Sequence, residues 1–132
     1  MRLSLDGAHL DDIIRHARDS FPNEACGILA GRDGKVLKLY RMINAERAEG
    51  RYSFFAGEQF EAQRRIRSEG FEMLGIYHSH PHTRACPSLR DIELALHKGC
   101  SYLIISLMDT TPEVRSFKIA AGSVSEEVVD VT

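Results

Sequence analysis

Hydrophobic residues near the start of the chain recur with the period of a helix. They fall at i, i+3, i+4 and i+7, at Leu10, Ile13, Ile14 and Ala17. This spacing predicts a helix over residues 6–20. Two further helices are predicted, one over 57–69 that Gly70 ends and one over 88–98 that Gly99 ends.

Short apolar runs between these helices have the length and composition of strands. The run from Met73 to Tyr77 suits a buried strand, and Asp33-Gly34 is a strong signal for a two-residue hairpin turn. The predicted strands cover residues 25–32, 35–42, 52–55, 72–78, 101–108, 113–119 and 124–130. Elements in this order predict a mixed α/β fold. No repeat, low-complexity tract or linker divides the chain, so we expect one domain over residues 1–132.

The composition of the chain mainly excludes classes of function. The chain has 132 residues, of which 43% are hydrophobic and 27% charged, as in ordinary globular domains. A formal net charge of -2 argues against general nucleic-acid binding, which needs a basic face. No apolar run is long enough for a signal peptide or a membrane span. The three cysteines cannot all pair within the chain, so we expect free thiols and a cytoplasmic protein.

Two histidines, His78 and His80, lie at the end of the strand predicted around the Met73 run. Side chains two residues apart on a strand project from the same face, so both imidazoles can reach one metal ion. A loop with two prolines then leads to Asp91, whose carboxylate would be a third ligand. Either histidine alone would be an ordinary side chain, but the three residues together indicate a site for one Zn²⁺. Such N/O ligands do not choose strictly among first-row metals.

Glu24 and Ser88 are candidates for the catalytic groups beside this metal. Three protein ligands leave a tetrahedral zinc with one open position for water, whose pKa falls to roughly 7. Glu24 would be the general base for that water, and Ser88 would donate a hydrogen bond to the developing oxyanion. Simpler explanations stay open. Glu24 could be a solvated turn residue, and Ser88 with Asp91 reads as the capping box of a helix, a role compatible with catalysis.

For Cys86 and the remaining histidines, the sequence gives weaker evidence of a role at the metal site. Cys86 lies between His80 and Asp91 and could compete for the zinc or be oxidised near it. His82 follows the histidine pair directly and could contact substrate or bind a second metal. We expect instead an incidental thiol and a solvent-facing histidine. His9, His16 and His97 are expected to be surface residues of the predicted helices.

The arrangement of these residues resembles the JAMM (MPN+) metalloprotease family. A glutamate is followed by H-x-H-P at 78–81, six further residues, and S-x-x-D at 88–91, and the segments around Glu24 and His78 are also similar. The resemblance spans about residues 5–120, and no position of the motif is missing.

The resemblance implies an MPN (cytidine-deaminase-like) fold, with a mixed central β-sheet flanked by helices. It also implies one Zn²⁺ per chain held by His78, His80 and Asp91, with Glu24 as base and Ser88 as oxyanion partner.

The function implied by the family is cleavage next to ubiquitin or a ubiquitin-like protein. This chain is a compact version of the domain without insertions, and such versions resemble bacterial enzymes that act on ubiquitin-like sulfur-carrier proteins. Our first hypothesis is therefore a zinc metallopeptidase that cuts after the C-terminal Gly-Gly of such a carrier and releases cysteine, in sulfur transfer or cysteine biosynthesis. A Gly-Gly tail has little bulk and can lie extended along a strand edge.

Alternatives to this hypothesis stay open. One is the trimming of a carrier precursor, and another is a deubiquitinase-like isopeptidase that releases a modifier from lysine. A third is a binding module that recognises a ubiquitin-like protein without cleaving it. A zinc deaminase is disfavoured, because its H-x-E and P-C-x-x-C motifs are absent.

Overall fold

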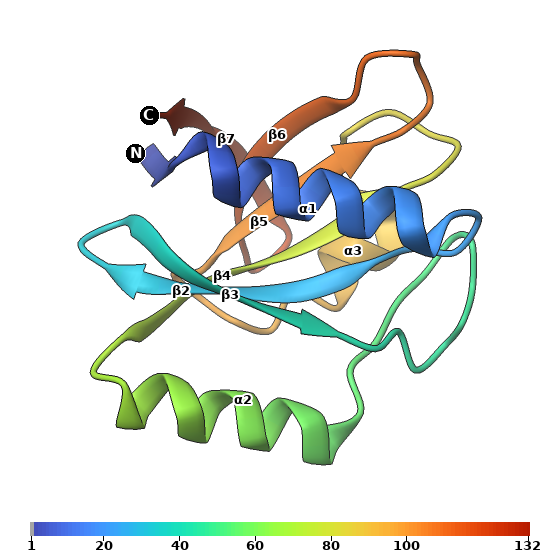
Figure 1. The fold of residues 1–132 in the computed structure, drawn as a ribbon. Helices are drawn as coiled ribbons and strands as arrows, with labels where there is room; N and C mark the ends of the chain where they lie inside the picture. Colours follow the sequence, from blue (N-terminus) through green and yellow to red (C-terminus); the bar gives the residue numbers. More distant parts are fainter. Residues whose placement is uncertain (1) are drawn as a thin grey trace.

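The computed structural model describes residues 2–132 as one mixed sheet and three helices. Along the chain the elements are β1 (Arg2–Leu5), α1 (Gly7–Ser20), β2 (Cys26–Arg32), β3 (Lys35–Met42), α2 (Ala56–Ser68), β4 (Glu72–His80), α3 (Leu89–Glu93), β5 (Ser101–Ser106), β6 (Glu113–Ala120) and β7 (Ser123–Val131). The strands follow the order β1-β3-β2-β4-β5-β6-β7 and the sheet closes into a barrel. β1 closes it by pairing parallel to both β3 and β7, which places the two ends of the chain side by side (Figure 1).

Helices α1 and α2 lie on opposite sides of strands β2, β3 and β4 (Figure 1). Successive side chains of a strand point to opposite faces, so β2 serves both helices. Leu29 belongs to the core cluster that contains Ile13 of α1. Its neighbour Ile28 belongs to a second cluster with Ala62 and Ile66 of α2. Both faces of the sheet are therefore buried here, as the continuous apolar run in β2 requires.

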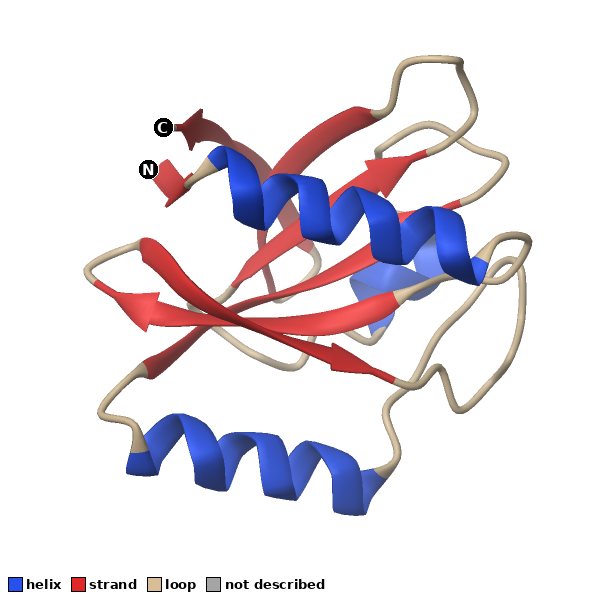
Figure 2. Ribbon diagram, viewed as in Figure 1, coloured by secondary structure: helices blue, strands red, loops and turns tan. Residues whose placement is uncertain are grey.

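Three connecting loops meet at one end of the sheet (Figure 2). They follow α1, β3 and β4. The loop after β3 is hydrogen-bonded to the segment that leads into β2, because the Glu24 N–H donates to the carbonyl of Ala48 over 2.9 Å. The loop after β4 meets the other two, since His82 lies edge-on to Phe21 and within 2.8 Å of Glu49. The candidate site lies at this end.

Most of the predicted elements are confirmed. The helices expected over 6–20 and 57–69 correspond to α1 and α2, and the mixed sheet with flanking helices is present. Asp33 and Gly34 have φ values of 52° and 75°, the left-handed conformations of a type I′ hairpin turn. No helix within residues 2–132 is both long and apolar enough to cross a membrane.

Two predicted features are wrong or incomplete, and one strand was not predicted. The helix expected over 88–98 spans only Leu89–Glu93, and the exposed Leu94 and Leu96 give it no apolar stripe that could extend it. Residues 52–55 form no strand. β1 was not predicted, because a four-residue strand carries little pattern and depends on pairing with β7 at the other end of the chain.

Candidate metal centre

Strand β4 presents His78 and His80 on one face, as their spacing predicts. Both side chains are buried, with exposed fractions of 0% and 4%. Ser79 between them points the other way, and its hydroxyl accepts a 2.7 Å hydrogen bond from the Ala25 N–H. The Ser79 N–H in turn donates to the Ala25 carbonyl over 3.0 Å. These two bonds fix the residue after Glu24 against the histidine strand, a positioning role for Ser79 that the sequence does not indicate.

Asp91 reaches the two histidines from the first turn of α3. The capping box expected for Ser88 and Asp91 is present: the Asp91 N–H donates to Ser88 Oγ over 3.0 Å, and the Ser88 N–H donates to Asp91 Oδ2 over 2.9 Å. The same Oδ2 lies 3.1 Å from Nε2 of His78 and 3.1 Å from Nε2 of His80. The cap therefore aims the carboxylate at the histidines.

Three potential ligand atoms form an equilateral triangle. The two Nε2 atoms are also 3.1 Å apart, so every edge from His78 to His80 to Asp91 has the same length. Ligands about 2.0–2.1 Å from a tetrahedral zinc lie about 3.3 Å from each other, so the triangle closely matches one face of that tetrahedron. The residues present thus fit a zinc ion.

The protonation of His80 is set by its other ring nitrogen. Nδ1 lies 2.8 Å from the Arg84 carbonyl, which can only accept, so Nδ1 carries the proton and a neutral ring leaves the Nε2 lone pair free. Burial lowers the pKa of His78, which favours the neutral, ligating form of that ring. Burial by itself would raise the pKa of Asp91, but the two imidazole rings beside it and the hydrogen bond from the Ser88 N–H outweigh burial and hold that pKa well below its usual range.

Glu24 lies two residues before β2, with a fixed backbone and one carboxyl oxygen that has no partner among the described residues. Its carbonyl accepts from Asn44 Nδ2 over 3.1 Å, and the residue is only 4% exposed. Its Oε1 atom is buried without a hydrogen-bond partner among the described residues. Burial raises the pKa of Glu24 to about 8, with the charge of His80 opposing the rise and that of Asp91 adding to it. A buried, unpaired carboxyl electrostatically coupled to the ligands is well placed to exchange a proton with a group that enters the site.

Tyr52 lies at the site although nothing in the sequence indicates this position. Its ring stacks on that of His78, with centroids 4.6 Å apart and planes at 25°. Asn44 shapes the loop that carries it: its Oδ1 accepts from the Ser53 N–H over 3.3 Å and its Nδ2 donates to the Arg51 carbonyl over 3.0 Å. No local pattern points to this contact, because only the fold brings the loop to the histidine strand.

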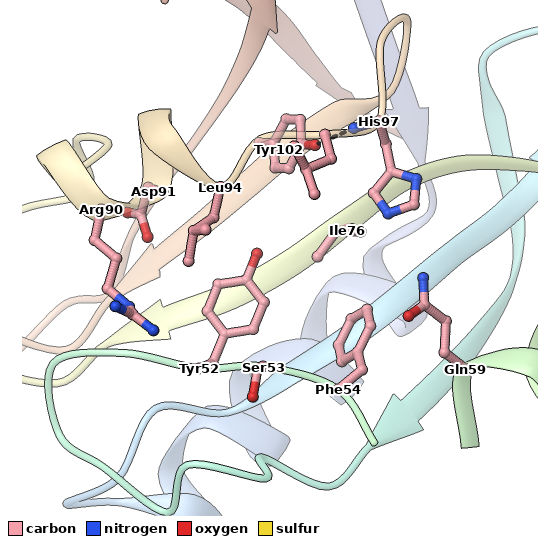
Figure 3. A pocket seen from close by; sticks show the side chains of 11 residues that line it. Tyr52, Ser53, Phe54, Gln59, Ile76, Arg90, Asp91, Leu94, His97 and Tyr102 are labelled. Atoms are coloured by element: carbon pink, nitrogen blue, oxygen red, sulfur yellow. Dashed lines mark hydrogen bonds between the residues drawn. The ribbon is translucent and has the colours of Figure 1, made fainter. Parts of the chain in front are cut away.

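A cavity of about 260 Å³ adjoins the cluster, between the Tyr52 loop and the segment after α3 (Figure 3). Most of its wall is apolar or aromatic, formed by Phe54, Ile76, Leu94 and Tyr102. Arg90 and Asp91 lie at one edge of the cavity and His97 at the other (Figure 3). An extended peptide or a small group can therefore lie against a largely apolar wall beside the metal ligands.

Four other residues lie outside the ligand triangle. His82 contacts Glu49, and the exposed Cys86 lies 3.2 Å from an Arg115 nitrogen. His16 and His97 were both expected on the surface of a helix, and both expectations are wrong. His97 lies in a loop and lines the cavity, and His16 is half-buried against the hydroxyl of Tyr77.

Comparison with known proteins identifies relatives along most of the chain. A family model described as prokaryotic homologs of the JAB domain matches residues 7–120. The chain is 38% identical over 122 residues to a CysO-cysteine peptidase of Mycobacterium tuberculosis, covering 90% of this chain and 84% of that protein. It is 37% identical over 112 residues to a desampylase of Haloferax volcanii, covering 80% of this chain and 81% of that protein.

Solved structures are similar over the whole fold. A solution structure of a protein from Desulfitobacterium hafniense matches with a TM-score of 0.90 and 37% identity, covering 100% of this chain and 93% of that one. A crystal structure of a JAB1/MPN domain protein from Archaeoglobus fulgidus matches with a TM-score of 0.66 and 18% identity, covering 98% and 96% of the two chains. The expected MPN fold is confirmed.

Proposed function

The chain belongs to the prokaryotic JAB-domain (JAMM/MPN) family, and from this we propose that it is a zinc metallopeptidase acting on a ubiquitin-like carrier protein. We propose further that it cuts after a C-terminal Gly-Gly of that carrier and releases cysteine. Relatives named as peptidase and desampylase support a hydrolase of this kind. The observation that carries the proposal is the triangle of ligand atoms with 3.1 Å edges.

The metal would be held by Nε2 of His78, Nε2 of His80 and Oδ2 of Asp91. A zinc ion bound there would supply a Lewis acid that polarises the substrate carbonyl and makes water nucleophilic at neutral pH. The Arg84 carbonyl keeps the His80 ring in the ligating tautomer, and the Ser88 N–H keeps the Asp91 carboxylate turned inward.

Glu24 is proposed to move the proton. In hydrolysis, the oxygen of water adds to the carbonyl carbon and the carbon–nitrogen bond breaks. The Glu24 carboxylate takes the proton of the attacking water and passes it to the nitrogen of the leaving amine. Oε1 has no hydrogen-bond partner among residues 2–132, which leaves it free for this exchange. A nearby cation would favour the charged, basic form of this carboxyl group over the protonated one that burial alone favours.

Ser88 is proposed to stabilise the charge that develops on the carbonyl oxygen. Its Oγ already accepts from the Asp91 N–H, which fixes the oxygen but leaves the hydroxyl proton free to donate. The capping and catalytic roles of Ser88 are therefore compatible.

A second candidate function is isopeptidase activity, which would release the same kind of carrier from a lysine side chain. The Haloferax relative, named a desampylase, favours keeping this candidate. The two activities share the same bond chemistry and differ only in what is attached to the leaving nitrogen.

Intact mass spectrometry of a carrier ending in Gly-Gly-Cys, incubated with the zinc-loaded protein, tests the proposal. Loss of one cysteine residue is the expected result. If the mass stays unchanged with zinc shown to be bound, a lysine-linked conjugate of the carrier is the next substrate. Tight binding of both without turnover would overturn the peptidase and leave a binding module.

A further inference from the structure

We propose that Arg90 recognises the free α-carboxylate of the residue that leaves when the carrier is cleaved. This inference rests on the proposed peptidase function and names the feature of the substrate that the site selects.

Arg90 lies at the edge of the metal centre. It is the second residue of α3, next to the ligand Asp91, and its exposed side chain lines the cavity that Tyr52 also lines. In Figure 3 the side chain extends from the helix toward the loop that carries Tyr52 and Ser53. The guanidinium therefore lies where a group beside the cut bond would pass.

The guanidinium of Arg90 forms no ion pair and no side-chain hydrogen bond with another of residues 2–132. Its charge is among the effects that lower the pKa of Glu46, but the carboxylate of Glu46 is paired with Arg51. Two arginines of neighbouring loops differ: Arg51 lies 3.2 Å from Glu46, and Arg84 lies 3.0 Å from Glu113. Their charges are already matched by protein carboxylates, whereas that of Arg90 remains available to a ligand.

The field of Arg90 reaches the reaction centre. Burial raises the pKa of Glu24 to about 8, and the positive charge of Arg90 is among the effects that oppose this rise. Arg47 also lacks a carboxylate partner among the described residues, but it lines a different hollow, with Glu24 and Asn44. Arg90 alone of the two lies on the cavity that contains a metal ligand.

The two substrate classes, an amino-acid adduct and a lysine-linked conjugate, differ in the charge carried close to the leaving nitrogen. A Gly-Gly tail carries no side-chain charge near the cut bond. When a single amino acid is attached to it, the leaving nitrogen bears a Cα atom with a negatively charged carboxylate. When lysine is attached through its side chain, the leaving nitrogen bears only methylene groups. A guanidinium fork binds a carboxylate through two parallel hydrogen bonds, so Arg90 would favour the first class.

Two adducts that differ only in this charge provide the test. A ubiquitin-like carrier thioester ending in Gly-Gly is ligated either to cysteine or to cysteinamide. We expect the zinc-loaded protein to cleave the carboxylate adduct with a kcat/KM roughly 10- to 100-fold above that of the amide, the range for a hydrogen bond to a charged group. Arg90→Gln should reduce cleavage of the carboxylate adduct more than cleavage of the amide, so that the ratio of the two kcat/KM values falls to about 1. Arg47→Gln, the matched control, should keep the preference.

Binding provides a second measurement that does not require turnover. In a Glu24→Gln background the carboxylate adduct should bind more tightly than the amide, and adding Arg90→Gln should remove the difference.

Equal cleavage and binding of the two adducts by protein with Arg90 intact would overturn the proposal while leaving the peptidase in place. An equal loss on both adducts in Arg90→Gln would also overturn it, since that points to a disturbed Asp91. Loss of the preference in Arg47→Gln instead would assign the carboxylate to the other arginine. If neither adduct is cleaved, the peptidase proposal fails, and the binding comparison still decides the role of Arg90.

Discussion

Neighbouring residues of β4 point to opposite faces of the sheet. Buried polar groups have a hydrogen-bond partner on one face and lack one on the other. Tyr77 points toward α1 and is 1% exposed, and its hydroxyl lies 2.7 Å from Nδ1 of His16. His78, the next residue, points to the other face and is 0% exposed, yet its Nδ1 has no partner among the described residues. Glu24, which is proposed to act on the same face as His78, also has a buried carboxyl oxygen without a partner among the described residues.

The difference shows which face stabilises the fold and which face is available for chemistry. A buried polar atom without a partner costs about 1–3 kcal/mol, so a protein tolerates such atoms mainly where they serve a ligand or a reaction. Substitutions on the Tyr77 face should therefore change the free energy of unfolding. Changes on the His78 face should mainly affect metal content and turnover.

Removal of the metal should have the largest effect on the His78 face. We expect chelation to abolish cleavage of the carrier adduct, because the three ligand residues alone cannot polarise the carbonyl. Added zinc should restore the activity, and circular dichroism should show that the metal-free protein keeps its secondary structure. Turnover by protein shown by elemental analysis to contain no metal would contradict the proposed site.

Glu24→Gln should have the next largest effect on that face. Loss of a general base should lower kcat by roughly 10²- to 10⁴-fold, while zinc stoichiometry stays that of the unmodified protein. The melting temperature should not fall, because glutamine has a similar shape and avoids burying an ionisable group without a partner. Glu49→Gln, which alters only an exposed partner of His82, is the matched control. A Glu24→Gln protein that cleaves at the unmodified rate would remove the assignment of the base.

Gly27→Ala tests the Tyr77 face. Gly27 pairs with Tyr77 across β2 and β4, and a Cβ atom at position 27 would overlap the Tyr77 ring. We expect the free energy of unfolding to fall by about 2 kcal/mol, a typical cost of overpacking, with zinc stoichiometry unchanged. Urea denaturation measures this effect. Gly57→Ala on α2 has nothing near the added Cβ, so it should leave stability unchanged or raise it by up to about 1 kcal/mol. Equal effects of the two substitutions would show that Tyr77 is not rigidly packed.

The sequence was sufficient to predict those site residues whose relation is local. The two-residue spacing of His78 and His80 on a strand and the capping box of Ser88 and Asp91 each predict a geometry that the structure contains. The hairpin at Asp33-Gly34 was predictable for the same reason, because a two-residue turn carries its own signal.

Contacts that depend on the folded chain were not predictable in this way. Tyr52 reaches His78 only through a loop that the side chain of Asn44 organises, and the expected strand at 52–55 failed because no neighbouring strand pairs there. His16 was expected at the surface because its helical spacing does not reveal that Tyr77 would reach its ring. Periodicity reports which face of an element is apolar but not which polar group it will meet.

The pH dependence of stability should reveal this His16 contact, the smallest of the predicted effects. Burial, and next the charge of Arg41, lower the pKa of His16 to about 4 from an ordinary value of 6.5. Between these values the unfolded chain binds more protons than the native protein, so the contribution of His16 is complete above pH 6.5 and is lost as the pH falls toward 4. Relative to His16→Gln, the metal-free protein should lose about 1 kcal/mol of stability between pH 7 and pH 4.5. This is less than the shift alone implies, because the ring is partly exposed to solvent.

Tyr77→Phe separates burial of the His16 ring from its hydrogen bond. Because burial is the larger cause of the lowered pKa, the variant should keep the pH dependence while losing about 1 kcal/mol of stability at every pH. Urea titrations of both variants at the two pH values give the comparison. If Tyr77→Phe removed the pH dependence, the hydroxyl rather than burial would hold His16 neutral, and the Tyr77 face would be as sensitive to protonation as the metal face beside it.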